Sequence, residues 1–189
     1  ANIEGAFIQF TVDESKNTDE GNYIIRAQND PNPGTFTTDN GDISTRSTFS
    51  TEINWTVPAN TWENAGEAGP NQRTADISEL LELITAQPGW AAGNAVVFTI
   101  TGTGTKVAES VDGDAAAAPV LSIAAFNSSD LSFQITEGSD DMEENLDDNN
   151  IDDGSSDLEL GSENGDGTSP QLVGLRFANV NLAPGQPIN

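Results

Sequence analysis

Short runs of β-forming residues, each bounded by turn residues, recur along the chain and constrain its fold more than any other feature. AFIQFTV (residues 6–12) and NYIIRAQ (residues 22–28) alternate apolar and polar side chains, as half-buried strands do. The other runs cover residues 43–57, 94–104, 118–126, 131–135, 156–160 and 171–177, and those at 94–104 and 118–126 are rich in β-branched residues. Many short strands joined by Gly-, Pro- and Asn-containing turns predict an all-β, antiparallel β-sandwich of jelly-roll type.

One segment departs from this pattern and predicts a single short helix. The apolar residues of TADISELLELITAQPGW recur at helical spacing, namely Ile77, Leu80, Leu81 and Ile84. Thr74 or Asp76 precedes them as a capping residue, and Pro88 followed by Gly89 ends the helix.

The charge of the chain excludes several classes of partner. Asp and Glu number 31 against 6 Lys and Arg, a formal net charge of −25. We therefore expect no nucleic-acid partner, which needs a basic surface, and no insertion into a membrane. Cysteine and histidine are absent, so disulfides, zinc sites and Ser-His-Asp or Cys-His catalysis are excluded. We expect that the protein is not an enzyme.

Residues 137–166 form the most acidic segment, with 13 of the 31 carboxylates and no basic residue. One interpretation is a solvated, self-repelling loop, or an acidic surface suited to high salt. The other is a Ca²⁺ site, because Ca²⁺ prefers clustered oxygen ligands; the regular EF-hand spacing is absent. The candidate ligands here are Asp140, Asp141, Glu143, Glu144, Asp147, Asp148, Asp152 and Asp153. A second acidic loop offers Glu109, Asp112 and Asp114.

Tryptophans are the candidates for binding a polysaccharide. The indole rings of Trp55 and Trp62 can stack on sugar rings. The alternative for these residues, and for Trp90, is a structural role in the core or at one end of the sandwich.

Several blocks carry a resemblance to a known family. SSDLELG, VGLRFANVNLAPGQPI, AFIQFTVDE and RTADISELLELITAQPGW resemble parts of a β-sandwich repeat common in large secreted bacterial proteins. The chain is more distantly similar to carbohydrate-binding-module-like jelly rolls with the DNRLRE signature. The resemblance implies a β-sandwich and an extracellular location. The order of the blocks differs from the family order, so the resemblance implies a circular permutation.

The permutation predicts two interdependent parts. Residues 1–126 form the back part of a sandwich, residues 127–130 a connector, and residues 131–189 the front part. Neither part has enough strands to cover its own apolar face and sheet edges. Four connector residues span at most about 14 Å. We therefore expect that residues 131–189 complete residues 1–126 of the next subunit or repeat. Closure within one chain requires that the strands flanking the connector be neighbours.

These features together predict a secreted structural subunit. We expect it to form an extracellular filament or tandem-repeat surface array, joined head-to-tail to copies of itself by strand complementation and supported by Ca²⁺. The alternative is a carbohydrate-binding or adhesive module that folds as a closed permutant.

Overall fold

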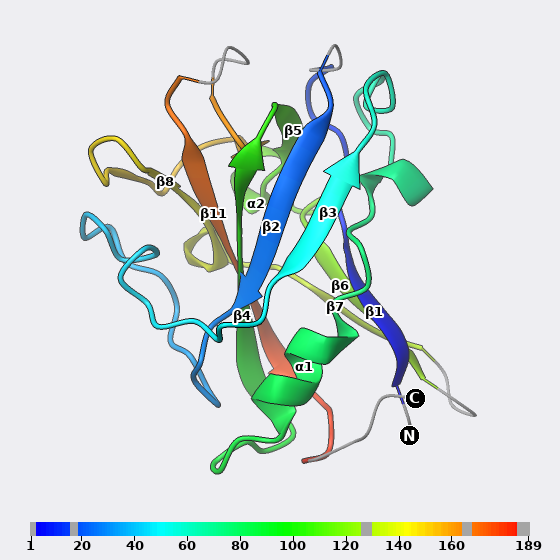
Figure 1. Cartoon of the computed structure of the whole chain (residues 1–189), viewed down its shortest axis with the longest axis vertical. Helices are drawn as coiled ribbons and strands as arrows, with labels where there is room; N and C mark the ends of the chain where they lie inside the picture. The colour runs from blue at the N-terminus through cyan, green and yellow to red at the C-terminus, as the bar shows by residue number, and fades with distance from the viewer. Residues whose placement is uncertain (1–2, 16–18, 126–129, 164–167, 185–189) are drawn as a thin grey trace.

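Two layers of antiparallel strands make up the fold, as predicted (Figure 1). The computed structural model describes residues 3–15, 19–125, 130–163 and 168–184. The strands are β1 (Ile3–Gln9), β2 (Gly21–Ala27), β3 (Ile53–Val57), β4 (Asn94–Thr103), β5 (Lys106–Glu109), β6 (Val120–Ala125), β7 (Leu131–Gln134), β8 (Asp141–Asn145), β9 (Ile151–Asp152), β10 (Asp157–Leu160) and β11 (Gln171–Val180). The helical segments are η1 (Pro70–Gln72), α1 (Ser78–Thr85), α2 (Val111–Asp114) and η2 (Gly138–Asp140).

The first layer is a six-stranded sheet in the order β3-β2-β4-β11-β8-β9. Strand β11, from the C-terminal part of the chain, lies between β4 and β8 (Figure 1). Its Leu175 is paired with Phe98 of β4 on one side and with Asp141 of β8 on the other. The C-terminal part therefore supplies strands to the interior of the sheet, not only to its edge.

The second layer consists of two small sheets joined by one extended segment. In the first, β1, β6 and β7 pair in that order; in the second, β10 pairs with β5. The chain leaving β1 continues along β5, where Val12 is paired with Ala108 and Thr11 accepts a hydrogen bond from the Glu109 backbone. The short helix α2 interrupts the path between β5 and β6.

The predicted helix is present as α1, and it packs against β1 and β2. Asp76 lies one residue before the N-cap, Ile77. Its Oδ1 accepts hydrogen bonds from the backbone N–H of Ser78 at 2.9 Å and of Ala6 at 3.0 Å. The same carboxylate therefore stabilises the start of the helix and fixes β1 beside it.

The core lies between the two layers. Ile8, Phe10 and Leu121 of the second layer are fully buried with Phe98 and Phe177 of the six-stranded sheet in one cluster. Full burial of each such side chain stabilises the fold by roughly 1.5–3 kcal/mol. Leu158 of β10 and Leu175 of β11 belong to the same cluster, so the two parts of the chain share one core.

A second, smaller cluster covers the outer face of the six-stranded sheet near β8. It contains Phe36, Ile43 and Met142 with three neighbours, Val97, Ile151 and Leu172. A Cβ at Gly174 of β11 would lie 2.7 Å from the Phe36 ring, so glycine is required for the loop that carries Phe36 to approach the sheet. The prediction of strand over residues 43–57 is only partly right. Ile53–Val57 is a strand, and most of the preceding residues form a loop that packs on this outer face.

Strands β6 and β7, on either side of the predicted connector, are antiparallel neighbours, with Ile123 opposite Leu131. Most of the connector, residues 127–129, and the junction between Asn189 and Ala1 lie outside the described residues. The pairing is the one that closure within a single chain requires. Completion by a neighbouring subunit uses the same pairings and stays a prediction.

Candidate metal centre

Strand β8 carries carboxylates on the face of the sheet that points to the core. Its residues Glu143 and Asn145 are paired with Val173 and Gln171 of β11. Paired residues of antiparallel strands project from the same face, and Val173 belongs to the core. The inner surface of the sheet therefore changes from apolar to acidic at β8. We call the inward-facing residues of β8, Asp141, Glu143 and Asn145, the acidic strip.

Glu143 is the most informative residue of the acidic strip because it is only 3% exposed. Its Oε1 accepts a hydrogen bond from the backbone N–H of Glu159 in β10. Burial, together with the neighbouring Glu159 carboxyl, raises the pKa of Glu143 well above its ordinary value. Burial likewise raises the pKa of Glu159. The site thus holds two carboxyl groups in contact, which favours a bound proton or a bound cation between them.

These two residues line a cavity of about 250 Å³. Among the described residues, every side chain that lines the cavity offers oxygen as a ligand atom: Glu143, Asn145, Asn150, Asp152, Ser155, Glu159, Glu163 and Gln171. Four are carboxylates, and no basic residue is among them. Ca²⁺ prefers oxygen ligands, so the chemistry of this lining suits that ion. The four carboxylates are not among the groups whose oxygens lie within 4.8 Å of one another, so the side chains would have to close around the ion. We call this site the oxygen-lined cavity.

Asp141 and Glu144 each keep one buried oxygen without a hydrogen-bond partner in the described part of the chain. The other oxygen of Asp141 accepts from the backbone N–H of Val111 at 2.9 Å, and that of Glu144 from Ser44 at 2.8 Å. Burial, then the charges of Asp112 and Asp140, raise the pKa of Asp141 to about 7. Glu144 lies on the opposite face of β8, away from the acidic strip.

Asp140 differs from these residues because a guanidinium group neutralises it. Arg176 of β11 donates two hydrogen bonds from Nη1 to its carboxylate, at 2.9 and 2.8 Å. Thr35 donates a third at 2.8 Å. A carboxylate held in this way has little capacity left for a metal ion.

A more exposed cluster of carboxylates lies beside Glu109, a residue of the second predicted acidic loop. Carboxylate oxygens of Asp13, Glu14 and Asp157 lie within 4.8 Å of one another. Burial, then the nearby Asp13, raise the pKa of Glu109 to about 7, and Asp114 acts in the same direction. The three predicted ligands of this loop do not line the oxygen-lined cavity.

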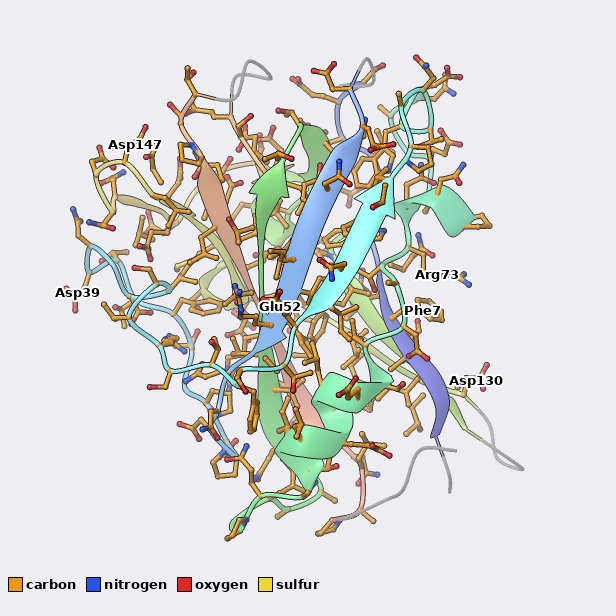
Figure 2. The ribbon with its side chains drawn as sticks, viewed as in Figure 1. Phe7, Asp39, Glu52, Arg73, Asp130 and Asp147 are labelled. Atoms are coloured by element: carbon orange, nitrogen blue, oxygen red, sulfur yellow. The ribbon has the colours of Figure 1, made fainter. Side chains whose placement is uncertain are left out.

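The sequence located the acidic region but not its ligand set. Of the predicted ligands, Glu143 and Asp152 line the oxygen-lined cavity. Asp147, Asp148 and Asp153 are exposed and do not line it; Figure 2 shows Asp147 at the margin of the molecule, on the turn between β8 and β9. The interpretation of the whole segment as a solvated loop is wrong, because it contains the buried strand β8.

Glu159, Glu163 and the amide and hydroxyl residues of the cavity were missed. The alternating DLEL of β10 was a signal for a strand with carboxylates on one face. Its position against β8, however, depends on the packing of the two layers, which no spacing in the sequence gives.

The two tryptophans predicted to bind a ligand lie in the core. Trp62 is 0% exposed, and Trp55 is 5% exposed and stacks on Phe10 with ring centroids 5.8 Å apart. The Nε1 of Trp62 donates to the carbonyl of Asn71 at 3.1 Å. Neither indole presents a face to solvent on which a sugar ring could stack, which corrects that prediction.

Comparisons with known proteins gave no relative of this chain: no family model, no curated protein and no solved structure matches it. Among the described residues, no helix is long and apolar enough to cross a membrane.

Proposed function

We propose that this chain is a calcium-stabilised structural module of an extracellular assembly. The oxygen-lined cavity carries the proposal. The carboxyl groups of Glu143 and Glu159 are in contact at the margin of a core, and no basic residue lines the cavity in the described part of the chain. A divalent cation would neutralise both groups, as Arg176 neutralises Asp140. The ion would thereby hold β8 and β10, one strand from each layer, together.

The extracellular setting is supported by the kind of site and by the composition. Extracellular modules bind Ca²⁺ with dissociation constants of about 10⁻⁴–10⁻³ M, an affinity that partly exposed carboxylates can provide. Asp152 and Glu163 are such residues. The net charge of −25 also suits a chain that is stabilised by an abundant cation. The role is structural, and we propose no catalytic activity.

Head-to-tail assembly is the finer part of the proposal. The pairings of β11 with β4 and of β7 with β6 join the two parts of the chain. Exchange of residues 131–184 between subunits would form the same pairings between two chains, and repeated exchange would give a filament. Closed and exchanged forms differ only in which chain supplies these strands.

The calcium proposal is tested by thermal unfolding at constant ionic strength. Ca²⁺ at 100 times its dissociation constant is expected to stabilise the protein by about 2.7 kcal/mol, or roughly 5–10 °C in Tm. The double variant Glu159→Gln, Glu163→Gln is expected to lose this increase. The matched control is Asp147→Asn, Asp148→Asn, which changes the charge equally at exposed positions outside the cavity.

Two results would contradict the calcium proposal. The first is an identical melt in EDTA and in Ca²⁺. The second is an equal increase in Tm with NaCl alone, since screening of the acidic surface would then explain the stabilisation.

Assembly is tested by a disulfide between β6 and β7. The chain has no cysteine, and Ser122 lies directly opposite Ser132. Opposite residues of antiparallel strands have the Cα separation that a disulfide needs. After oxidation of Ser122→Cys, Ser132→Cys, strand exchange is expected to give a ladder of covalent oligomers on a non-reducing gel. A monomer with an internal disulfide would remove the exchange proposal and leave a closed module.

A second candidate function, polysaccharide binding, is favoured by a groove on the outer face of the six-stranded sheet. The groove has a volume of about 240 Å³ and contains two of the six basic residues, Arg26 and Arg46. Hydroxyl and apolar groups complete its lining: Ile43, Ser44, Thr48, Thr99, Thr101, Leu146 and Leu172. Hydroxyl and guanidinium groups beside exposed apolar carbon match the surface of a sugar.

Glycan-array binding tests this second candidate. Thr101→Val is expected to weaken glycan binding without lowering Tm. The control Thr56→Val removes a hydroxyl from an exposed position of β3, outside the groove. A wild-type protein that binds no glycan would eliminate this candidate and leave the calcium proposal unaffected.

A further inference from the structure

We propose a second cation site, at Asp141 and Asp112, which ties the α2 helix to strand β8. It is separate from the oxygen-lined cavity, whose lining includes neither residue. The ligand is a hard divalent cation, for which Ca²⁺ is the probe.

The first observation is the unpartnered oxygen of Asp141. The residue is 5% exposed, and its Oδ1 is buried without a hydrogen-bond partner among the described residues. Its Oδ2 is already used by the backbone N–H of Val111, at the start of α2. A buried carboxylate oxygen without a donor is strongly unfavourable, whereas a coordinated cation satisfies both its charge and its lone pairs.

The second observation is the position of Asp112. A Cβ added to Gly138 would lie 2.3 Å from Asp112 Oδ2 and 3.0 Å from its Cγ. The carboxylate of Asp112 therefore rests against the backbone of η2, the turn that leads directly into Asp141. Only glycine at position 138 leaves room for it there. The fold thus holds a second negative charge near Asp141, although the two carboxylates repel each other.

In the part of the chain that the structure describes, no ion pair or hydrogen bond from a cationic group to Asp112 or Asp141 supplies the missing charge. Arg176 is the basic residue that reaches this region, and its Nη1 makes two hydrogen bonds to Asp140. Its Nε donates to the carbonyl of Pro33 at 2.9 Å. Asp112 and Asp141 therefore leave about two negative charges for one divalent ion to neutralise.

The two cation sites would be close to each other. Asp141 and Glu143 lie two residues apart on one face of β8, a separation of about 7 Å along the strand. Ions at this distance repel, so we expect them to bind in two steps of different affinity. Each ion would join β8 to a different element of the second layer, α2 in one case and β10 in the other.

The test is to count bound Ca²⁺ on the intact chain by native mass spectrometry and by isothermal titration. The wild type is expected to bind two ions. Asp141→Asn and Asp112→Asn are each expected to bind one. Gly138→Ala is also expected to lose an ion, because it displaces Asp112 without changing the net charge. The control Asp114→Asn, an exposed position in the same helix, is expected to keep both ions.

The cavity variant Glu159→Gln, Glu163→Gln separates this proposal from the preceding one. If both proposals hold, it keeps the ion at Asp141 and loses the other. If the cavity binds no ion, the wild type binds a single ion that Gly138→Ala removes. Two ions retained in folded Gly138→Ala and Asp112→Asn, or no ion bound in the wild type, would overturn the site at Asp141. Should Asp141→Asn fail to fold, the other two variants decide.

Discussion

The two strands that flank β11 give the inner face of the sheet opposite chemical character. On one side, β4 places Phe98 opposite Leu175, and the Phe98 and Phe177 rings lie 6.3 Å apart. On the other side, β8 places Glu143 opposite Val173. One inner surface therefore changes from aromatic to acidic across a single strand. The apolar side is stable through burial alone, whereas the acidic side needs positive charge.

Because of this difference, the stability of the two sides should depend differently on Ca²⁺ and on pH. Burial of apolar surface does not depend on Ca²⁺ and depends little on pH. Buried carboxylates depend on both, since a proton or a cation relieves the unfavourable burial of their charge. Substitutions on the two sides should therefore differ in how their effects change with conditions, not only in size.

The largest effect is expected from the apolar side. Trp62→Ala removes a fully buried ring that lies 6.4 Å from Phe10, between centroids. We expect a loss of roughly 3–5 kcal/mol in the free energy of unfolding. Chemical denaturation with and without Ca²⁺ measures it, and the loss should be the same in both. Leu146→Ala, at a position 37% exposed, is the control. A loss that Ca²⁺ largely repairs would break the comparison.

The next effect is expected at the acidic side, where Arg176 neutralises Asp140. The side chains are 19% and 7% exposed, so Arg176→Met leaves a buried, uncompensated carboxylate. We expect a loss of about 3 kcal/mol. The double variant Arg176→Met, Asp140→Asn should recover much of it, because the unpaired charge is gone. If the double variant is as unstable as the single one, packing of Arg176 rather than its charge is the main contribution.

The fold was predictable where apolar side chains recur with the period of a strand or of a helix. The alternation in AFIQFTV predicted β1 and the segment that follows it, and its inward residues Ala6, Ile8 and Phe10 are buried. The helical spacing of Ile77 to Ile84 predicted α1. The four-residue α2 carries no apolar stripe, and its Asp112 and Asp114 read as loop. Such a short helix is stabilised by its contacts with neighbouring elements rather than by the helix propensity of its own residues.

The acidic strip could not be predicted from the pattern. In DMEEN the inward residues are Asp141 and Glu143, so the strand has the polarity of a surface loop. What places them inside is pairing with β11, an element 30 residues further along the chain. The composition predicted an oxygen-rich metal site, which stays a prediction. It could not distinguish buried Glu143 from exposed Asp147, because both occur in the same acidic run.

A smaller effect is expected when pH is varied in the absence of Ca²⁺. Burial and Asp13 raise the pKa of Glu109 to about 7 from 4.5. The folded protein then binds more protons than the unfolded chain, so stability falls as pH rises from about 4.5 to 7 and is constant above. Glu109→Gln should make this part of the profile less steep and raise Tm at pH 8, while Asp141, whose pKa is also raised to about 7, keeps part of the slope. Exposed Glu63→Gln should leave the slope unchanged. A wild-type profile that rises through this range would contradict the assignment.

The smallest effect is expected from a second guanidinium–carboxylate pair, which lies on the solvent-facing side of the six-stranded sheet, away from β8. Arg26 of β2 pairs with Glu52, which is labelled at the centre of Figure 2. Their side chains are 35% and 41% exposed. A double-mutant cycle with Arg26→Met and Glu52→Gln should give a coupling of about 0.2–1 kcal/mol. Because salt screens exposed charges, about 1 M NaCl should remove most of it.

The corresponding cycle for Arg176 and Asp140 should give a larger coupling that persists in salt, since solvent reaches that pair much less. The two cycles involve the same guanidinium–carboxylate contact, so a difference between them measures the effect of position in the fold. Equal couplings with equal salt dependence would mean that the acidic side is as well solvated as the outer face. Its carboxylates would then need no cation, and the basis for both metal sites would be lost.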